Sequence, residues 1–119
     1  ACSVACWTSN KVVADDFVDL GRGHAEALVP MIASVMREAS IDYSQLDAVA
    51  VTLGPGTFTG LRVGLSAARG LALALSKPMV GVTSLEAIAH ATRFSQHSVL
   101  AILDARRGQL YAQSFDSEL

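Results

Sequence analysis

Cysteine, charge and long hydrophobic runs are all scarce in this sequence. Its 119 residues include 9 Lys and Arg against 11 Asp and Glu, for a formal net charge of −2. That balance gives no basic field, so the chain alone is not expected to bind nucleic acid tightly. The longest strongly apolar stretch, residues 64–75, contains Arg69 and is shorter than the roughly 20 residues that a membrane span needs. Disorder is excluded as well, because 51% of the residues are hydrophobic.

The sequence has only 2 cysteines, Cys2 and Cys6. In a strand, a rise of about 3.3 Å per residue puts their Cα atoms about 13 Å apart, too far for a disulfide. Two cysteines without further ligands do not form a zinc site either. Unpaired buried thiols are typical of a reducing compartment, so we expect a cytoplasmic protein.

Patterns that carry catalysis or hold a metal are also missing. The histidines are His24, His90 and His97, and no two of them have the spacing of a metal-binding pair on one helix. No Gly-x-Ser-x-Gly segment occurs, and no serine has a base beside it in the sequence. We therefore predict no metal site and no catalytic residue in this chain.

Hydrophobic periodicity predicts alternating strands and helices. The predicted strands are residues 1–7, 11–18, 47–53, 79–82, 98–103 and 109–115, and the predicted helices are residues 28–39, 61–75 and 84–92. The third and fourth strands are almost wholly apolar, which predicts burial on both faces. The order β-β-α-β-α-β-α-β-β is typical of an α/β fold with a mixed sheet flanked by helices. No linker or repeat divides residues 1–119, so we expect a single domain.

The ends of the helices leave alternatives open. Pro30 either kinks the first helix or indicates that the helix begins near Leu28. Thr59 and Ser84 are the expected N-caps of the second and third helices. A capping box in the third helix would need an acid one residue after Glu86, so we expect an imperfect motif there.

The most distinctive segment is the glycine-rich run 54–64, between a predicted strand and a predicted helix. Free N–H groups at such a helix start favour anions. A Walker A loop would need Lys where the chain has Leu61, however, and a dinucleotide fingerprint would need glycine at Thr59. The pattern favours the other interpretation, that the glycines allow a tight turn and close packing of the helix. The candidate loop residues are Gly54, Pro55, Gly56, Thr57, Phe58, Thr59, Gly60 and Arg62.

A charged turn precedes Gly108. Asp104, Arg106 and Arg107 either form a contact surface or belong to a turn in which the aspartate bonds to nearby backbone. The sequence favours the local turn.

At residues 54–64, Gly-Pro-Gly-Thr-Phe-Thr-Gly-Leu-Arg-Val-Gly, the sequence resembles the TsaB (YeaZ) family, bacterial subunits of the machinery that makes threonylcarbamoyladenosine in tRNA. Residues 1–5, 24–32, 81–87 and 104–111 are also similar to family segments. The resemblance implies the actin/Hsp70-like (ASKHA, ribonuclease H-like) fold, in its N-terminal lobe. It also implies that the family's first strand and C-terminal lobe lie outside residues 1–119, which would then be one lobe truncated at both ends.

The resemblance further implies a non-catalytic scaffold subunit that activates a TsaD-like catalytic paralogue. A TsaE-like ATPase and a homodimer are the other implied partners, and tRNA would be reached only through the complex. ATP and metal would belong to the partner subunits, with no cofactor bound by this chain alone. Where TsaD has a His-x-x-x-His metal pair, this chain has Ser84 and Ile88. The alternative is an ASKHA-type nucleotide-binding enzyme or an M22-like peptidase that uses loop 54–60.

Small and Met-rich faces on the first two predicted helices indicate where partners would bind. A face of small residues lets a neighbouring helix approach closely, and that neighbour belongs either to the same chain or to a partner. In the family these two helices form the dimer surface. The expected partner contacts are Met31, Val35, Gly64, Leu65 and Ala68.

Overall fold

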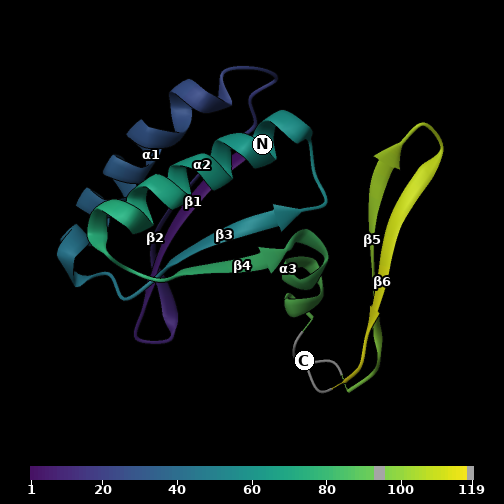
Figure 1. Cartoon of the computed structure of the whole chain (residues 1–119). Coiled ribbons are helices and arrows are strands. Elements are labelled where there is room, and N and C mark those ends of the chain that lie inside the picture. Colours follow the sequence, from purple (N-terminus) through teal and green to yellow (C-terminus); the bar gives the residue numbers. More distant parts are fainter. Residues whose placement is uncertain (93–95, 118–119) are drawn as a thin grey trace.

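A computed structural model describes residues 1–92 and 96–117 of the chain (Figure 1). It contains the nine elements predicted from the sequence, in the predicted order, and a short 3-10 helix that the sequence did not indicate. The elements are β1 (Cys2–Thr8), β2 (Lys11–Val18), α1 (His24–Ala39), η1 (Tyr43–Gln45), β3 (Val49–Gly54), α2 (Phe58–Leu75), β4 (Met79–Thr83), α3 (Ser84–His90), β5 (Val99–Arg106) and β6 (Gln109–Phe115).

The strands pair in three two-stranded ladders. β1–β2 and β5–β6 are antiparallel hairpins, and β3–β4 is a parallel pair joined by α2. The predicted α/β class is confirmed, but the expected mixed sheet is not observed, because the parallel pair and the antiparallel pairs form separate two-stranded sheets in the described residues. Within the described ranges no ladder joins one pair to another. Figure 1 shows the β5–β6 hairpin standing apart from the other strands, with α3 between them.

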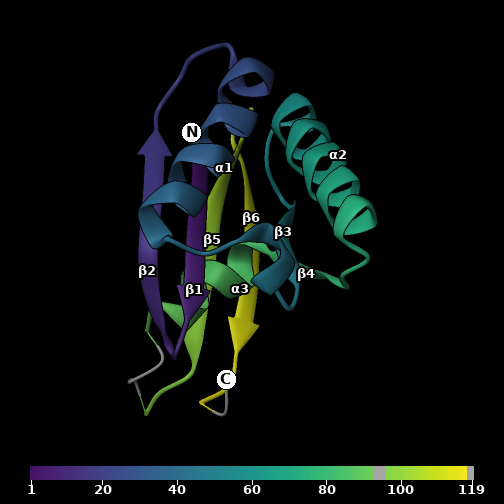
Figure 2. The same cartoon turned by 90° about the vertical axis from the view of Figure 1, so that its left-hand side faces the viewer.

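The two long helices lie side by side over the first four strands. α1 packs on β1 and β2, α2 packs mainly on β3, and the two helices also contact each other (Figure 2). The α1 core contains Cys6, Ala14, Val35 and Met36, and Val35 at 1% exposure is its most deeply buried large side chain. A second, smaller core joins α3 to the β5–β6 hairpin through Leu85, Ala89 and Ala101.

The prediction that β3 and β4 are buried on both faces is wrong. Leu53 is 53% exposed, and Met79 and Val80 are also exposed. The two strands form too narrow a sheet to be covered, because α2 lies mainly on β3 and the seven-residue α3 is too short to shield the rest. Burial on both faces was inferred from hydrophobicity alone, which does not report how many elements pack nearby.

The fold leaves an unusually large surface accessible. Its accessible area is 8586 Å². A compact monomer of 12.5 kDa would expose roughly 6,200 Å². Large apolar side chains contribute to it, and the exposed ones include Trp7, Phe17, Leu100 and Leu110. In the part of the chain that the structure describes, no helix is both long and apolar enough to cross a membrane.

Helix α1 begins before Leu28, so of the two alternatives the one with Pro30 inside the helix agrees with the structure. It starts at His24, after Gly23 in the left-handed conformation (φ 87°), and Pro30 lies inside it. No side chain caps its first turn. At this interior position Pro30 removes one backbone donor from the helix, and its ring crowds the carbonyl of Glu26, four residues earlier.

Both predicted N-caps are displaced. Helix α2 is capped by Thr57 rather than Thr59, since the Thr57 hydroxyl accepts a hydrogen bond from the N–H of Gly60 at 3.3 Å. Helix α3 is capped by Thr83 rather than Ser84. That shift puts Glu86 at the third helical position, so the capping box is complete: the Thr83 N–H donates to Glu86 Oε2 at 2.7 Å and the Glu86 N–H donates to Thr83 Oγ1 at 3.1 Å. These backbone and side-chain hydrogen bonds lower the pKa of Glu86.

Candidate functional site

The glycine-rich loop packs tightly on the first turns of α2. Gly54 is buried and has φ 111°, a conformation that residues with a side chain rarely adopt. A Cβ at Gly54 would lie 3.0 Å from Leu61 Cδ1, and one at Gly56 would lie 3.5 Å from Leu61 Cδ2. Leu61 therefore covers the loop backbone where side chains would otherwise stand. This geometry supports the interpretation that the glycines serve packing.

The loop is also tied to α3. Ser84, the first residue of that helix, donates its hydroxyl hydrogen to the Pro55 carbonyl at 2.7 Å. The Gly54–Pro55 peptide bond is cis. The Leu61 side chain from α2 and the Ser84 hydroxyl from α3 thus hold the loop from two sides.

An exposed aromatic–cation pair follows the loop. Phe58, the first residue of α2, is 73% exposed, and the guanidinium carbon of Arg62 lies 5.1 Å from its ring centre. Such a pair is attractive even at a surface. One N–H of the helix start is already bonded to Thr57, which reduces what the loop offers an anion. The loop itself contains no carboxylate or imidazole that could act as an acid or base.

The residues considered for metal binding lie apart from one another. His24 begins α1 and His90 ends α3. Of the two positions matched to the TsaD metal pair, Ser84 bonds to the glycine loop and Ile88 is exposed on α3. Among residues 1–92 and 96–117, no group of three His, Cys, Asp or Glu side chains could hold a metal ion.

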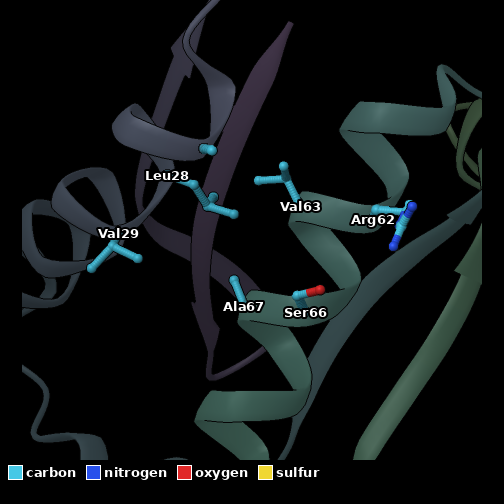
Figure 3. A pocket seen from close by; sticks show the side chains of 7 residues that line it. Leu28, Val29, Arg62, Val63, Ser66 and Ala67 are labelled. Carbon is cyan, nitrogen blue, oxygen red and sulfur yellow. The ribbon is translucent and has the colours of Figure 1, made fainter.

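A shallow groove of about 320 Å³ runs between α1 and α2 (Figure 3). In the close view, Leu28 from α1 and Val63 from α2 point toward one another across the contact. Val29 is 63% exposed at the rim, and Arg62 brings a positive charge to the α2 side. The lining residues are Ala25, Leu28, Val29, Arg62, Val63, Ser66 and Ala67. Sequence reasoning nominated only Arg62 of these, as a loop residue. Knowing which faces of the two helices meet would have identified the others.

The five expected partner contacts lie largely inside the chain's own fold. Met31, Val35 and Ala68 are buried, and Gly64 and Leu65 are half-buried. The nearest atom to a Cβ at Gly64 would be Val51 Cγ2 of β3, at 4.0 Å, so this small residue faces the strand. The structure does not bring the five together on one open surface, and their contact with a partner stays a prediction.

The charged turn between β5 and β6 is held locally. Asp104 Oδ1 accepts a hydrogen bond from the Arg106 N–H at 2.7 Å. The two turn residues, Arg107 and Gly108, have φ 54° and 72°, as two-residue hairpin turns require, and Arg106 at the end of β5 also has a positive φ of 63°. The predicted local turn is confirmed.

Both the sequence and the structure of this chain are similar to those of known proteins. A family model described as "TsaD: tRNA N6-adenosine threonylcarbamoyltransferase" matches residues 19–118. The chain is 37% identical over 113 residues to the "tRNA threonylcarbamoyladenosine biosynthesis protein TsaB" of Escherichia coli, covering 93% of this chain and 48% of that protein. It is 47% identical over 74 residues to a "tRNA N6-adenosine threonylcarbamoyltransferase" of Erythrobacter litoralis, covering 62% of this chain and 22% of that protein.

A solved structure, "YeaZ from Pseudomonas aeruginosa", matches with a TM-score of 0.85 and 33% identity, covering 97% of this chain and 55% of that one. The chain thus spans about half the length of the TsaB relatives it matches.

Proposed function

Because the chain belongs to the TsaB (YeaZ) family, and the TsaD family model also matches most of it, we propose that it acts as a non-catalytic scaffold in threonylcarbamoyladenosine modification of tRNA. Its partner would be a TsaD-like catalytic paralogue that transfers the threonylcarbamoyl group. A TsaE-like ATPase would join the complex. Those subunits would hold ATP and metal, and tRNA would be bound through the assembled complex. The complex would act in the cytoplasm.

The observation that carries this proposal is the open groove between α1 and α2. Its lining is mostly apolar, it has an exposed valine at one rim, and its α2 side includes Arg62, whose guanidinium lies over the exposed Phe58 ring. Buried aromatic and arginine side chains dominate the binding energy of many protein interfaces. A helix of the TsaD-like partner, or of a second copy of this chain, would cover the groove. Met31, Val35, Gly64, Leu65 and Ala68 would then support this face, since most of their surface is already covered within the fold.

A reconstituted assay tests the role. Threonylcarbamoylation of tRNA by TsaD-like and TsaE-like proteins, together with the enzyme that supplies the activated intermediate, is measured with and without this protein. We expect modification to require the protein, and the protein alone to have no activity. Equal modification without it would refute the scaffold role. Hydrolysis of ATP or of peptides by the protein alone would favour the alternative, a nucleotide-binding enzyme or peptidase that uses loop 54–60.

The groove is tested by a matched pair of variants. Val29→Arg puts a charge at the exposed rim, and Leu73→Arg makes the same kind of change at an exposed position of α2 that does not line the groove. We expect Val29→Arg to weaken binding of the TsaD-like partner by about 10-fold or more, as loss of an interface anchor does, and Leu73→Arg to leave it unchanged. Equal effects of the two variants would rule out the groove as the contact.

A further inference from the structure

Ser84 makes a side-chain hydrogen bond between two elements that are far apart in the sequence. Its hydroxyl meets the Pro55 carbonyl across 29 positions of sequence. By comparison, six other side chains make hydrogen bonds that stay within a turn or a cap and span at most 3 positions: Gln45, Thr57, Thr83, Glu86, Thr92 and Asp104. Ser84 therefore joins two elements, whereas these others stabilise single ones.

This bond is separate from the capping of α3. Thr83 and Glu86 form the complete capping box, and neither uses the Ser84 hydroxyl. Removing that hydroxyl would leave the helix start intact. The half-buried carbonyl of Pro55 would lose its hydrogen-bond donor instead.

The loop end of the bond leads directly into α2. Only Gly56 and Thr57 separate Pro55 from Phe58, and Leu61 packs back onto the loop glycines. A movement of Pro55 would shift the first turn of α2, which carries the exposed Phe58 and the Arg62 that stacks on it. The position of this pair relative to α3 thus depends on a short, tightly packed segment with one side-chain anchor on α3.

We propose that Ser84 is a positioning residue: through the Pro55 carbonyl it fixes the first turn of α2, and with it Phe58 and Arg62, for binding of the TsaD-like partner. The inference rests on the function proposed above. A surface fixed before binding loses less conformational entropy when the partner docks, so it binds more tightly with the same contacts. The partner group that fits this end is an apolar side chain beside a carboxylate, complementary to the ring and the guanidinium.

Four forms of the full-length protein test the proposal: wild type, Ser84→Ala, Ser84→Thr and Thr92→Val. Thr92 also donates its hydroxyl to a carbonyl at 2.7 Å, but its acceptor is the nearby Ala89, so it is the control for losing a local bond from the other end of α3. We expect Ser84→Ala to weaken partner binding by about 3–10-fold, the range for loss of one hydrogen bond. Ser84→Thr keeps the hydroxyl and should restore the affinity to within about twofold, and Thr92→Val should leave it unchanged.

Amide hydrogen exchange in the unbound protein supplies a readout that does not depend on the partner. We expect faster exchange over residues 56–62 in Ser84→Ala, and wild-type rates there in the other variants. Unchanged exchange in Ser84→Ala would overturn the anchoring. Faster exchange with wild-type affinity would overturn the role in partner binding. If the wild-type protein does not bind the partner at all, the proposed function fails and the positioning role fails with it, while the exchange data alone decide whether Ser84 anchors the loop.

Discussion

The contact between β3 and β4 yields a quantitative prediction about stability. Gly81 lies beside Leu53 of the neighbouring strand, and a Cβ at position 81 would stand 2.4 Å from Leu53 Cδ1 and 2.8 Å from Leu53 Cγ. A terminal methyl could rotate away, but Cγ moves only if the whole side chain swings out. We therefore expect Gly81→Ala to destabilise the protein by about 2 kcal/mol, within the usual range for overpacking.

A double-mutant cycle with Leu53→Ala tests that cause. Leu53 is half exposed, so truncating it alone should cost about 1 kcal/mol or less. When Leu53→Ala is combined with Gly81→Ala, the clash is removed. The double variant should therefore lose less stability than the two single losses added together, by about 1 kcal/mol or more. Urea denaturation with an unchanged m-value measures each term. Additive effects would refute the reasoning, because the alanine would then be destabilising for a reason unrelated to Leu53.

Four further changes are predicted. Gly70 lies in α2 with open space around it, so Gly70→Ala should raise the stability by about 1 kcal/mol in the same denaturation assay. Val35→Ala removes two methyl groups from the centre of the α1 core and should cost about 2–3 kcal/mol, with an intact fold by circular dichroism. Gly54→Ala must adopt φ 111° against Leu61 and should lose about 1–3 kcal/mol. The lowered pKa of Glu86 stabilises α3 at pH values above its ordinary value of 4.5, and this contribution is lost as the pH falls through the lowered pKa. Glu86→Gln keeps the capping geometry and should abolish that pH dependence, which NMR of α3 amides would follow.

The order of elements was predictable because it depends on local patterns. The strands predicted at residues 1–7 and 11–18 form the β1–β2 hairpin, in which Ser9 and Asn10 make the turn with φ 51° and 63°. The strand Gln109–Phe115 was predicted with its observed limits. The packing role of the glycine loop also followed from local chemistry, since no phosphate-binding motif was complete.

Features that depend on distant neighbours were not predictable in the same way. Thr57 and Thr59 are both reasonable caps, and only the path of the loop brings the first hydroxyl to an N–H. The bond from Ser84 to Pro55 crosses two elements, and no pattern in the sequence indicates it. The α1–α2 groove depends on which helix faces meet, so a small-residue stripe taken for a partner surface could equally face a strand, as Gly64 does.

Because of Pro30, the two helices that form the walls of the groove differ in how completely their backbones are hydrogen-bonded. The missing N–H of Pro30 removes one backbone hydrogen bond from α1, and no side chain caps the start of the helix, so fewer hydrogen bonds hold the segment from His24 to Val29 than hold the rest of α1. Ala25, Leu28 and Val29 line the groove from that segment, whereas the α2 wall belongs to an uninterrupted helix with a capped start. The α1 wall of the groove is therefore held by fewer hydrogen bonds than the α2 wall. We expect the α1 wall to move more readily than the α2 wall if a helix binds in the groove.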